Sequence, residues 1–333
     1  MSGWAPAGAA AVPSFTLLTP EDIAALPDLE WLIEGVLPKP GLVVLYGEPG
    51  SGKTFAALDM ALTVASGREW LGRVTLQTKA LYIAAEGVRG FKLRVAAHAH
   101  RRGLTPENIR FIAEVPLIMD PAHIRALLAS FEKDDFEPGL IVVDTLARVA
   151  LGADENNAKD MGRVVDGLDE LKRQTGATVM VIHHTRKDGG SERGSSALRG
   201  AADAMILCEK VPSLDGAGVR LECAKMKDDE PFADIGATLE KVALPGGKSS
   251  LIVGDVFDIL RATGQHADKI VEILTANFAE SGATHGELKN AFVAETGNSA
   301  STFNRAWRGL KETDRVRIET VDGRTRIYPA KKD

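Results

Sequence analysis

Cysteines, aromatic side chains and long apolar runs are all scarce in this sequence. Its 333 residues include two cysteines, and aromatic residues make up 5%. Cys208 and Cys223 form no CxxC motif, which excludes a disulfide-stapled miniprotein. Their symmetric placement about the turn at 214–216 allows them to face each other across a hairpin, but two small core residues are the simpler interpretation. No apolar run approaches the roughly 18 residues that span a bilayer, so we expect no membrane association.

We also expect no signal peptide. Residues 1–17 are rich in alanine, glycine and proline and lack the basic start and apolar core of such a peptide. We therefore expect a disordered lead-in over 1–17 and a cytoplasmic protein. Apolar residues make up 44% and charged residues 26%, close to the averages for soluble globular proteins, so wholesale disorder is excluded. The length predicts about two domains.

Charge of one sign does not dominate, but its distribution is uneven. The net charge of −6 disfavours a nucleic-acid coat over the whole surface. Ser301–Asp333 nevertheless carries nine Lys and Arg against five Asp and Glu, so this tail is +4 and the remainder is −10. A compact basic patch on an acidic body favours a localised DNA contact.

Strand-like and helix-like segments alternate from Gly41 to about Gly254, which predicts an α/β fold with a mostly parallel sheet. Runs such as Ile141–Val143 are apolar on both faces, as in a parallel strand covered by helices. The expected strands are Leu42–Tyr46, Ala80–Ala84, Ile109–Ala113, Leu140–Asp144, Thr178–His183, Ala204–Cys208 and Val219–Ala224, the last two as an antiparallel extension. The expected helices are Lys53–Ser66, Gly90–Arg102, Pro121–Lys133 and Lys159–Thr175.

The pattern changes after a break around Leu244–Gln265. Three helical segments and two short β runs follow, with the hairpin signal Asp322-Gly323 between the β runs. We predict an ATPase-type domain over 18–254, a linker over 255–267 and a small winged-helix-like domain over 268–333. The expected elements of that domain are the helices Asp268–Glu280, Thr284–Thr296 and Ser301–Thr313 and the strands Val316–Thr320 and Thr325–Tyr328.

A complete phosphate-loop motif, GxxxxGK[ST], joins an apolar strand to a helix. Its glycines turn backbone N–H groups toward phosphate oxygens at the positive end of the helix. Within it, Lys53 is expected to bridge the β- and γ-phosphates of a nucleoside triphosphate, and Thr54 to bind Mg²⁺. The alternative is a fortuitous glycine-rich turn. The motif residues are Gly47, Glu48, Pro49, Gly50, Ser51, Gly52, Lys53 and Thr54.

Two acidic residues complete the predicted catalytic site. Asp144 ends a buried strand, where it is placed to hold Mg²⁺ through water. The next residue is Thr145, so the second carboxylate that many phosphate-loop enzymes carry there is absent. Glu86, at the tip of the Leu81–Ala84 strand run, is therefore the predicted general base. The alternative is a surface glutamate that begins a loop.

Basic and polar groups near other strand ends are further candidates. His183 and His184 end a strand, and since neighbours point to opposite faces, we favour His184 as a γ-phosphate sensor. The Gly/Ser-rich loop that follows carries Arg186, Lys187 and Arg193, which suit ssDNA phosphates or a solvated linker.

Two lysines, Lys225 and Lys227, share one face at the end of a later strand. They are candidates for completing a neighbour's nucleotide site in trans. Alternatively, they discourage aggregation at an exposed edge.

The last predicted helix carries an apolar face and a basic face. Phe303, Ala306, Trp307 and Leu310 follow helical spacing and are expected to face a core. Basic residues lie opposite them and on the hairpin, which favours duplex DNA binding, although winged helices also bind proteins. The candidate DNA contacts are Arg305, Arg308, Lys311, Arg324 and Arg326.

In combination, these motifs resemble those of the RecA-like hexameric ATPases, in particular the plasmid RepA replicative helicases. The resemblance spans Trp31 to Leu239. It rests on the phosphate loop and on further motifs, namely Ala85-Glu86, Val143-Asp144-Thr145-Leu146, Glu155-Asn156, His183-His184 with Lys187, Arg193-Gly194-Ser195-Ser196 and Pro231-Phe232-Ala233-Asp234. It implies a RecA-like core, ATP with Mg²⁺, a homo-hexameric ring with ATP between subunits, and ssDNA in the central channel. By the same resemblance, Glu86 is the catalytic glutamate and His184 the phosphate sensor. Arg193 and Arg199 compete with the lysines as the trans finger.

The sequence therefore predicts a ring-forming, DNA-stimulated ATPase, most simply a replicative helicase of a plasmid, phage or similar element. The alternative is an ATP-regulated DNA-binding protein, such as an initiator, helicase loader or regulator, that does not unwind DNA. A recombinase-type filament is a third interpretation.

Overall fold

The computed structural model describes residues 16–86, 88–103, 107–184, 196–213, 216–257, 259–297, 300–311, 313–321 and 324–330. Most of the predicted lead-in, residues 1–15, lies outside the described residues, as does the predicted basic loop at 185–195. No helix in the described part is long and apolar enough to cross a membrane.

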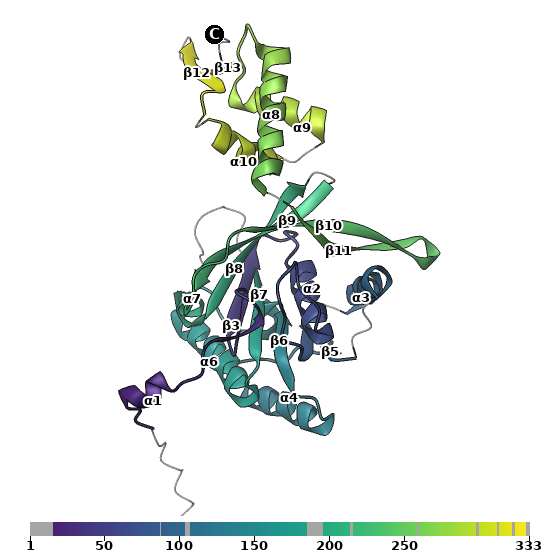
Figure 1. Cartoon of the computed structure of the whole chain (residues 1–333), viewed down its shortest axis with the longest axis vertical. Helices are drawn as coiled ribbons and strands as arrows, with labels where there is room; N and C mark the ends of the chain where they lie inside the picture. Colours follow the sequence, from purple (N-terminus) through teal and green to yellow (C-terminus); the bar gives the residue numbers. More distant parts are fainter. Residues whose placement is uncertain are drawn as a thin grey trace, which may run out of the picture.

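A nine-stranded sheet forms the centre of the molecule, in the order β11-β10-β9-β8-β3-β7-β6-β4-β5 (Figure 1). The six strands from β8 to β5 in that order are parallel, and β9, β10 and β11 extend the sheet in antiparallel fashion. Its strands are β3 (Leu42–Gly47), β4 (Lys79–Ala84), β5 (Ile109–Ile112), β6 (Pro138–Asp144), β7 (Thr178–His184), β8 (Ala204–Ser213), β9 (Gly216–Met226), β10 (Ile235–Leu244) and β11 (Lys248–Phe257). The predicted α/β class with a mostly parallel sheet is confirmed.

Helices cover both faces of this sheet. The other elements before residue 259 are α1 (Pro20–Ala24), β1 (Glu30–Ile33), β2 (Leu37–Lys39), α2 (Lys53–Ser66), α3 (Arg89–Arg102), α4 (Pro121–Lys133), α5 (Leu146–Val149), α6 (Ala158–Thr175), α7 (Ser196–Ala201) and the 3₁₀ turn η1 (Pro245–Gly247). Residues of α2 pack on one face of the sheet and residues of α4, α5, α6 and α7 on the other.

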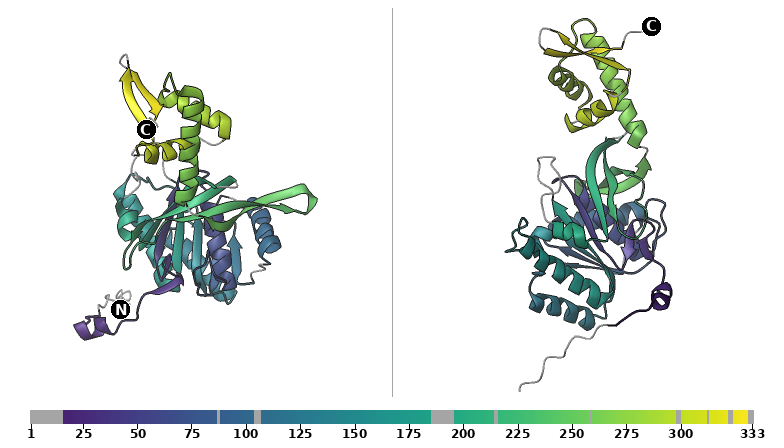
Figure 2. Two further views of the ribbon diagram at one scale, coloured as in Figure 1. Left: turned by 45° about the horizontal axis from the view of Figure 1, so that its top comes forward. Right: turned by 90° about the vertical axis from the view of Figure 1, so that its left-hand side faces the viewer.

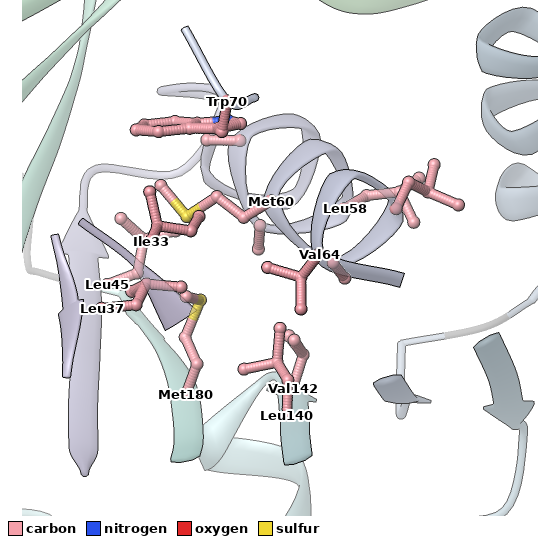
Figure 3. Packing of buried hydrophobic residues seen from close by; sticks show 14 of the residues in the cluster. Ile33, Leu37, Leu45, Leu58, Met60, Val64, Trp70, Leu140, Val142 and Met180 are labelled. Carbon is pink, nitrogen blue, oxygen red and sulfur yellow. The ribbon is translucent and has the colours of Figure 1, made fainter. Parts of the chain in front are cut away.

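Alternation along each strand explains why the strands are apolar throughout. In β3, Val43 and Leu45 belong to the core under α2, while Leu42 and Val44 belong to the core on the opposite face. Figure 3 shows the first core, in which Val142 of β6 lies beside Val64 of α2. Successive strand residues point to opposite faces, so a strand with helices on both sides is apolar at every position.

The chain after β11 forms a separate core. It consists of α8 (Ile259–Phe278), α9 (His285–Thr296), α10 (Ala300–Leu310) and the antiparallel pair β12 (Val316–Val321) and β13 (Arg324–Pro329). The predicted core face of α10 is confirmed, because Phe303, Ala306, Trp307 and Leu310 are all buried in this core. Ala283 pairs with Ile327 of β13, which ties the α8–α9 connection to the hairpin.

Two local predictions were wrong. The segment taken as a break and a linker, 255–267, contains the end of β11 and the first half of α8. Strands β10 and β11 had not been predicted, and they form a hairpin that projects from the sheet (Figure 2). Of the two interpretations of the cysteines, the simpler one agrees with the structure, since both are free and Cys208 is buried, with Cys223 half-buried. Cys208 pairs in register with Leu221, so the two cysteines do not face each other.

Candidate nucleotide-binding and catalytic site

The phosphate loop lies between β3 and α2, as the motif requires. Gly47 has a φ of +152°, and a Cβ there would lie 2.2 Å from the carbonyl oxygen of Cys208. Gly52 has a φ of +103°, and its Cβ would lie 2.5 Å from Val219 Cγ1. Both positions therefore require glycine. No side chain caps the N-terminus of α2, so the helix presents uncapped backbone N–H groups to an anion.

Lys53 is buried inside this loop. Its ammonium donates hydrogen bonds to the carbonyls of Gly47 at 2.9 Å and Glu48 at 2.8 Å. Burial lowers the pKa of Lys53, and the nearby carboxylates of Asp144 and Glu86 oppose that shift. A buried cation with acidic neighbours in a loop of backbone donors is suited to hold phosphate oxygens.

Asp144 ends β6 and is 3% exposed. The hydroxyl of Tyr82 donates to Asp144 Oδ2 at 2.8 Å, and the side chain of Thr54 also forms a hydrogen bond to this carboxylate. Burial raises the pKa of Asp144, and these two hydrogen bonds oppose the shift. Within the described residues, Asp144 Oδ1 has no hydrogen-bond partner. An unpartnered buried oxygen beside a threonine hydroxyl fits a hydrated Mg²⁺ ion.

Strand β7 separates the phosphate-loop strand β3 from the Asp144 strand β6. The end of β7 consequently lies between them, and it carries His183 and His184. His183 is buried, whereas His184 is half-buried and its Nε2 lies 3.6 Å from Glu86 Oε1. The structure therefore brings together Lys53, Thr54, Asp144, Glu86 and His184 at the carboxyl edge of the sheet.

Glu86 follows β4 in a turn, and its side chain is 54% exposed. Thr145 Oγ1 donates to Glu86 Oε1 at 3.1 Å. The Glu86 carboxylate is thus open to water while two neighbouring strand ends contact one of its oxygens. This is the arrangement expected of a group that accepts a proton from a water molecule.

Lys225 and Lys227 are not part of this cluster. Met226 pairs with Ala204, the first residue of β8, which in turn pairs with Val43 near the start of β3. The end of β9 therefore lies at the amino ends of the parallel strands, whereas the phosphate loop lies at their carboxyl ends. Lys225 Nζ donates to the α7 carbonyls of Arg199 at 2.7 Å and Gly200 at 3.3 Å, and Lys227 lies 3.6 Å from Asp203. Neither lysine reaches the nucleotide site of its own chain. The carbonyls at the end of α7 hold the Lys225 ammonium, and a role of either lysine toward a neighbouring copy stays a prediction.

The predicted DNA contacts are only partly described. Arg186, Lys187 and Arg193 lie outside the described residues. Arg305 and Arg308 lie on α10 and Arg324 on β13, but their side chains are outside the description, and Lys311 is exposed just after α10. Arg326 donates to Gly282 O at 3.2 Å and lies 3.3 Å from Glu287, so it contacts the start of α9 rather than projecting freely.

Sequence reasoning missed two residues of the site. Tyr82 is fully buried in β4, and a buried tyrosine hydroxyl normally needs a hydrogen-bond partner, which was a usable signal. Thr145 was noted only as a missing carboxylate. Arg94 is a more remote neighbour, with its guanidinium 4.8 Å from the ring centroid of Phe55, next to Thr54.

The fold and the site define a phosphate-loop nucleotide-binding protein with a RecA-like α/β core. Residues 11–190 match the family model AAA_25, described as AAA domain, and the chain belongs to this family. The matched segment includes the phosphate loop, Glu86, Asp144 and His184.

Two individual proteins are similar to parts of the chain. The DNA repair protein RadA of Aquifex aeolicus (strain VF5) is 24% identical over 216 residues, which cover 59% of this chain and 44% of RadA. The match thus spans less than half of RadA. A KaiC-like protein from Pyrococcus horikoshii OT3 superposes with a TM-score of 0.43 and 16% identity, covering 67% of this chain and 93% of that one.

Proposed function

We propose that the chain is an ATP-dependent, ring-forming DNA motor, a replicative helicase of a plasmid, phage or similar element. The observation that carries the proposal is the convergence of Lys53, Asp144 and Glu86 at one edge of the sheet. Lys53 and Asp144 are buried there, whereas Glu86 is open to water. That division suits ATP hydrolysis, in which the phosphates are enclosed and a water molecule is activated beside them.

The chemistry follows from these positions. The loop N–H groups and Lys53 hold the phosphates, and Mg²⁺, bound through Thr54 and Asp144, would neutralise charge on the phosphate oxygens. Glu86 accepts a proton from water as the water oxygen attacks the γ-phosphorus. The bond between that phosphorus and the β–γ bridging oxygen breaks, and ADP leaves. His184, beside Glu86, senses the γ-phosphate.

In a ring, the amino ends of the parallel strands of one copy would meet the carboxyl ends of the strands of the next copy. In a head-to-tail contact, a different surface of each copy meets its neighbour, and such contacts close into rings when the rotation allows. The lysines at the end of β9 then face the nucleotide of the next copy. Lys227, whose side chain is 58% exposed, is the lysine available for this role, since Lys225 is held by α7. We propose a hexamer, with ATP at each interface.

Two observations support DNA as the partner. The similar protein RadA is named as a DNA repair protein, and the tail of this chain is basic on an acidic body. We assign ssDNA in the central channel to the loop with Arg186, Lys187 and Arg193. The part from α8 to β13, residues 259–329, which we propose is a winged-helix domain, binds duplex DNA through α10 and the β12–β13 hairpin.

Strand displacement on a forked duplex tests the proposal. We expect ATP-dependent displacement together with a hexamer in native mass spectrometry when ATP and an oligonucleotide are present. ATP hydrolysis without displacement would instead support the ATP-regulated DNA-binding protein. A single subunit that hydrolyses ATP at full rate under all conditions would exclude the ring.

The double variant Arg305→Ala and Arg308→Ala tests the duplex contact separately. Loss of two phosphate contacts should weaken duplex binding and reduce the slope of its salt dependence by about 2. Basal ATP hydrolysis should not change, because the variant leaves the nucleotide site intact. Unchanged duplex affinity would make the C-terminal part a protein-docking module.

A further inference from the structure

Thr145 stands at the N-cap of α5 but does not act as a cap. Its backbone is extended, with φ −123° and ψ 165°, as at an N-cap. Threonine at this position usually accepts a hydrogen bond from the first turn of the helix. Thr145 makes no such bond. Its hydroxyl donates across the sheet edge to Glu86 Oε1 instead.

The hydroxyl that makes this contact is fixed in place. Thr145 is 1% exposed, and it follows Asp144 at the end of a strand buried on both sides. Glu86 lies in a turn with more than half of its side chain exposed. A flexible exposed carboxylate samples many rotamers, whereas one bound to a fixed donor is held in fewer. The contact therefore restrains Glu86 much more than it restrains Thr145.

The direction of this restraint suits a base. Thr145 and His184 both contact Oε1 of Glu86, at 3.1 and 3.6 Å, and neither contact uses Oε2. One carboxylate oxygen is anchored while the other remains to accept a proton. The residue after Asp144 is a threonine rather than an acidic residue, and its hydroxyl binds the carboxylate of Glu86, which follows β4.

We propose that Thr145 is a positioning residue, whose hydroxyl orients Glu86 for proton abstraction from the attacking water. This inference rests on the proposed role of Glu86 as the general base. Geometry matters steeply in such steps, because a displacement of about 1 Å costs about 100-fold in rate.

Replacement of Thr145 by valine and by serine isolates the hydroxyl. Thr145→Val keeps the shape and removes the donor, so kcat for ATP should fall by about 10- to 100-fold. The KM for ATP should stay within about twofold, because the interaction acts on the transition state rather than on ATP binding. Thr145→Ser keeps the hydroxyl and should retain kcat within about threefold of the parent protein. If Thr145→Val does not fold, Thr145→Ala carries the same expectation.

The Glu86→Gln background separates this inference from the proposed function. If Thr145 acts through Glu86, adding Thr145→Val to Glu86→Gln should lower kcat by less than about twofold. If Thr145→Val keeps the parental kcat, the inference is overturned while the proposed function stands. The same holds if Thr145→Ser loses as much kcat as Thr145→Val, or if Thr145→Val loses ATP affinity to the same extent as kcat. Parental kcat in Glu86→Gln overturns the role of Glu86, and the inference with it.

Discussion

Helix α2 takes part in two polar clusters that differ in their access to solvent. The nucleotide cluster, at its N-terminus, consists of Lys53, Asp144, Tyr82, Glu86 and His184. There, Asp144 Oδ1 has no partner among the described residues, and Glu86 is exposed.

The Asp59 cluster, further along α2, consists of Asp59, Trp70, His98 and Arg102. Asp59 accepts a hydrogen bond from Trp70 Nε1 at 2.9 Å, and Arg102 Nη1 lies 3.0 Å from its other oxygen. His98 Nδ1 lies 3.6 Å from the same oxygen, and both side chains are almost fully buried. Arg102 also donates to the carbonyl of Val253 in β11. The cluster therefore joins α2, α3 and the β10–β11 hairpin.

Burial shifts the pKa values in both clusters, so a shifted pKa does not by itself mark the functional site. Burial raises the pKa of Asp59 to about 7 and lowers that of His98 to about 4. The difference lies in access. In the Asp59 cluster, Asp59, Trp70 and His98 are buried, and among the described residues Asp59 Oδ1 and His98 Nδ1 lack a hydrogen-bond partner, as Asp144 Oδ1 does. The nucleotide cluster instead opens to solvent at the carboxyl edge of the sheet, where the Glu86 side chain is 54% exposed.

We expect the largest loss of stability when the Asp59 cluster loses its carboxylate. Asp59→Ala leaves Arg102 and Trp70 without their acceptor, so the free energy of unfolding should fall by about 3 kcal/mol or more. ATP affinity of the folded protein should not change. Urea denaturation and nucleotide titration measure the two quantities. Asp166→Ala, which removes an exposed acidic residue of α6, is the matched control. Parental stability with impaired ATP binding would reverse the assignment of the two clusters.

The Tyr82 hydroxyl offers a milder change in the open cluster. Tyr82→Phe removes the donor to Asp144 Oδ2, and we expect about 1 kcal/mol of lost stability. The half-saturating Mg²⁺ concentration for ATP binding should rise about fivefold, since the orientation of Asp144 is loosened. Nucleotide binding in the presence of a chelator should not change. This control distinguishes weaker Mg²⁺ binding from damage to the phosphate loop itself. An unchanged Mg²⁺ dependence would show that Tyr82 only fills space.

A further effect is expected in the pH dependence of the Asp59 cluster. Because the pKa of His98 is about 4 in the folded chain and 6.5 in the reference state, the folded state binds fewer protons between these values. The stability that His98 contributes is complete above pH 6.5 and is lost as the pH falls toward 4. In His98→Gln, the loss of stability between pH 6.5 and 4 should be smaller by up to about 3 kcal/mol. Parallel stability curves for the two proteins would contradict a buried neutral imidazole.

Much of the fold was predictable because buried parallel strands are continuous apolar runs. The β3, β6 and β7 segments are of this kind, and glycine and lysine at fixed spacing mark the phosphate loop. The β10–β11 hairpin was missed because its strands are half-exposed and its turn, Pro245–Gly247, was taken as the start of a break. The 255–267 segment was taken as a linker, although α8 starts at Ile259.

The site was predictable only residue by residue. Lys53, Thr54 and Asp144 belong to motifs with their own spacing, and Glu86 was inferred from a strand tip. The contacts of Tyr82 with Asp144 and of Thr145 with Glu86 cross between neighbouring strands. Which strands are neighbours depends on the order of the whole sheet, and no local pattern reports that order.

Glu86→Gln tests the account most directly, through ATP binding and ATP turnover measured on the same preparation. Glutamine keeps the shape of the side chain and cannot take the proton, so kcat should fall by about 100-fold or more. ATP binding should persist, because Lys53 and the phosphate loop are untouched. Glu132→Gln, an exposed change on α4, is the control. Turnover at the parental rate in Glu86→Gln would contradict the account, since hydrolysis would then use another base.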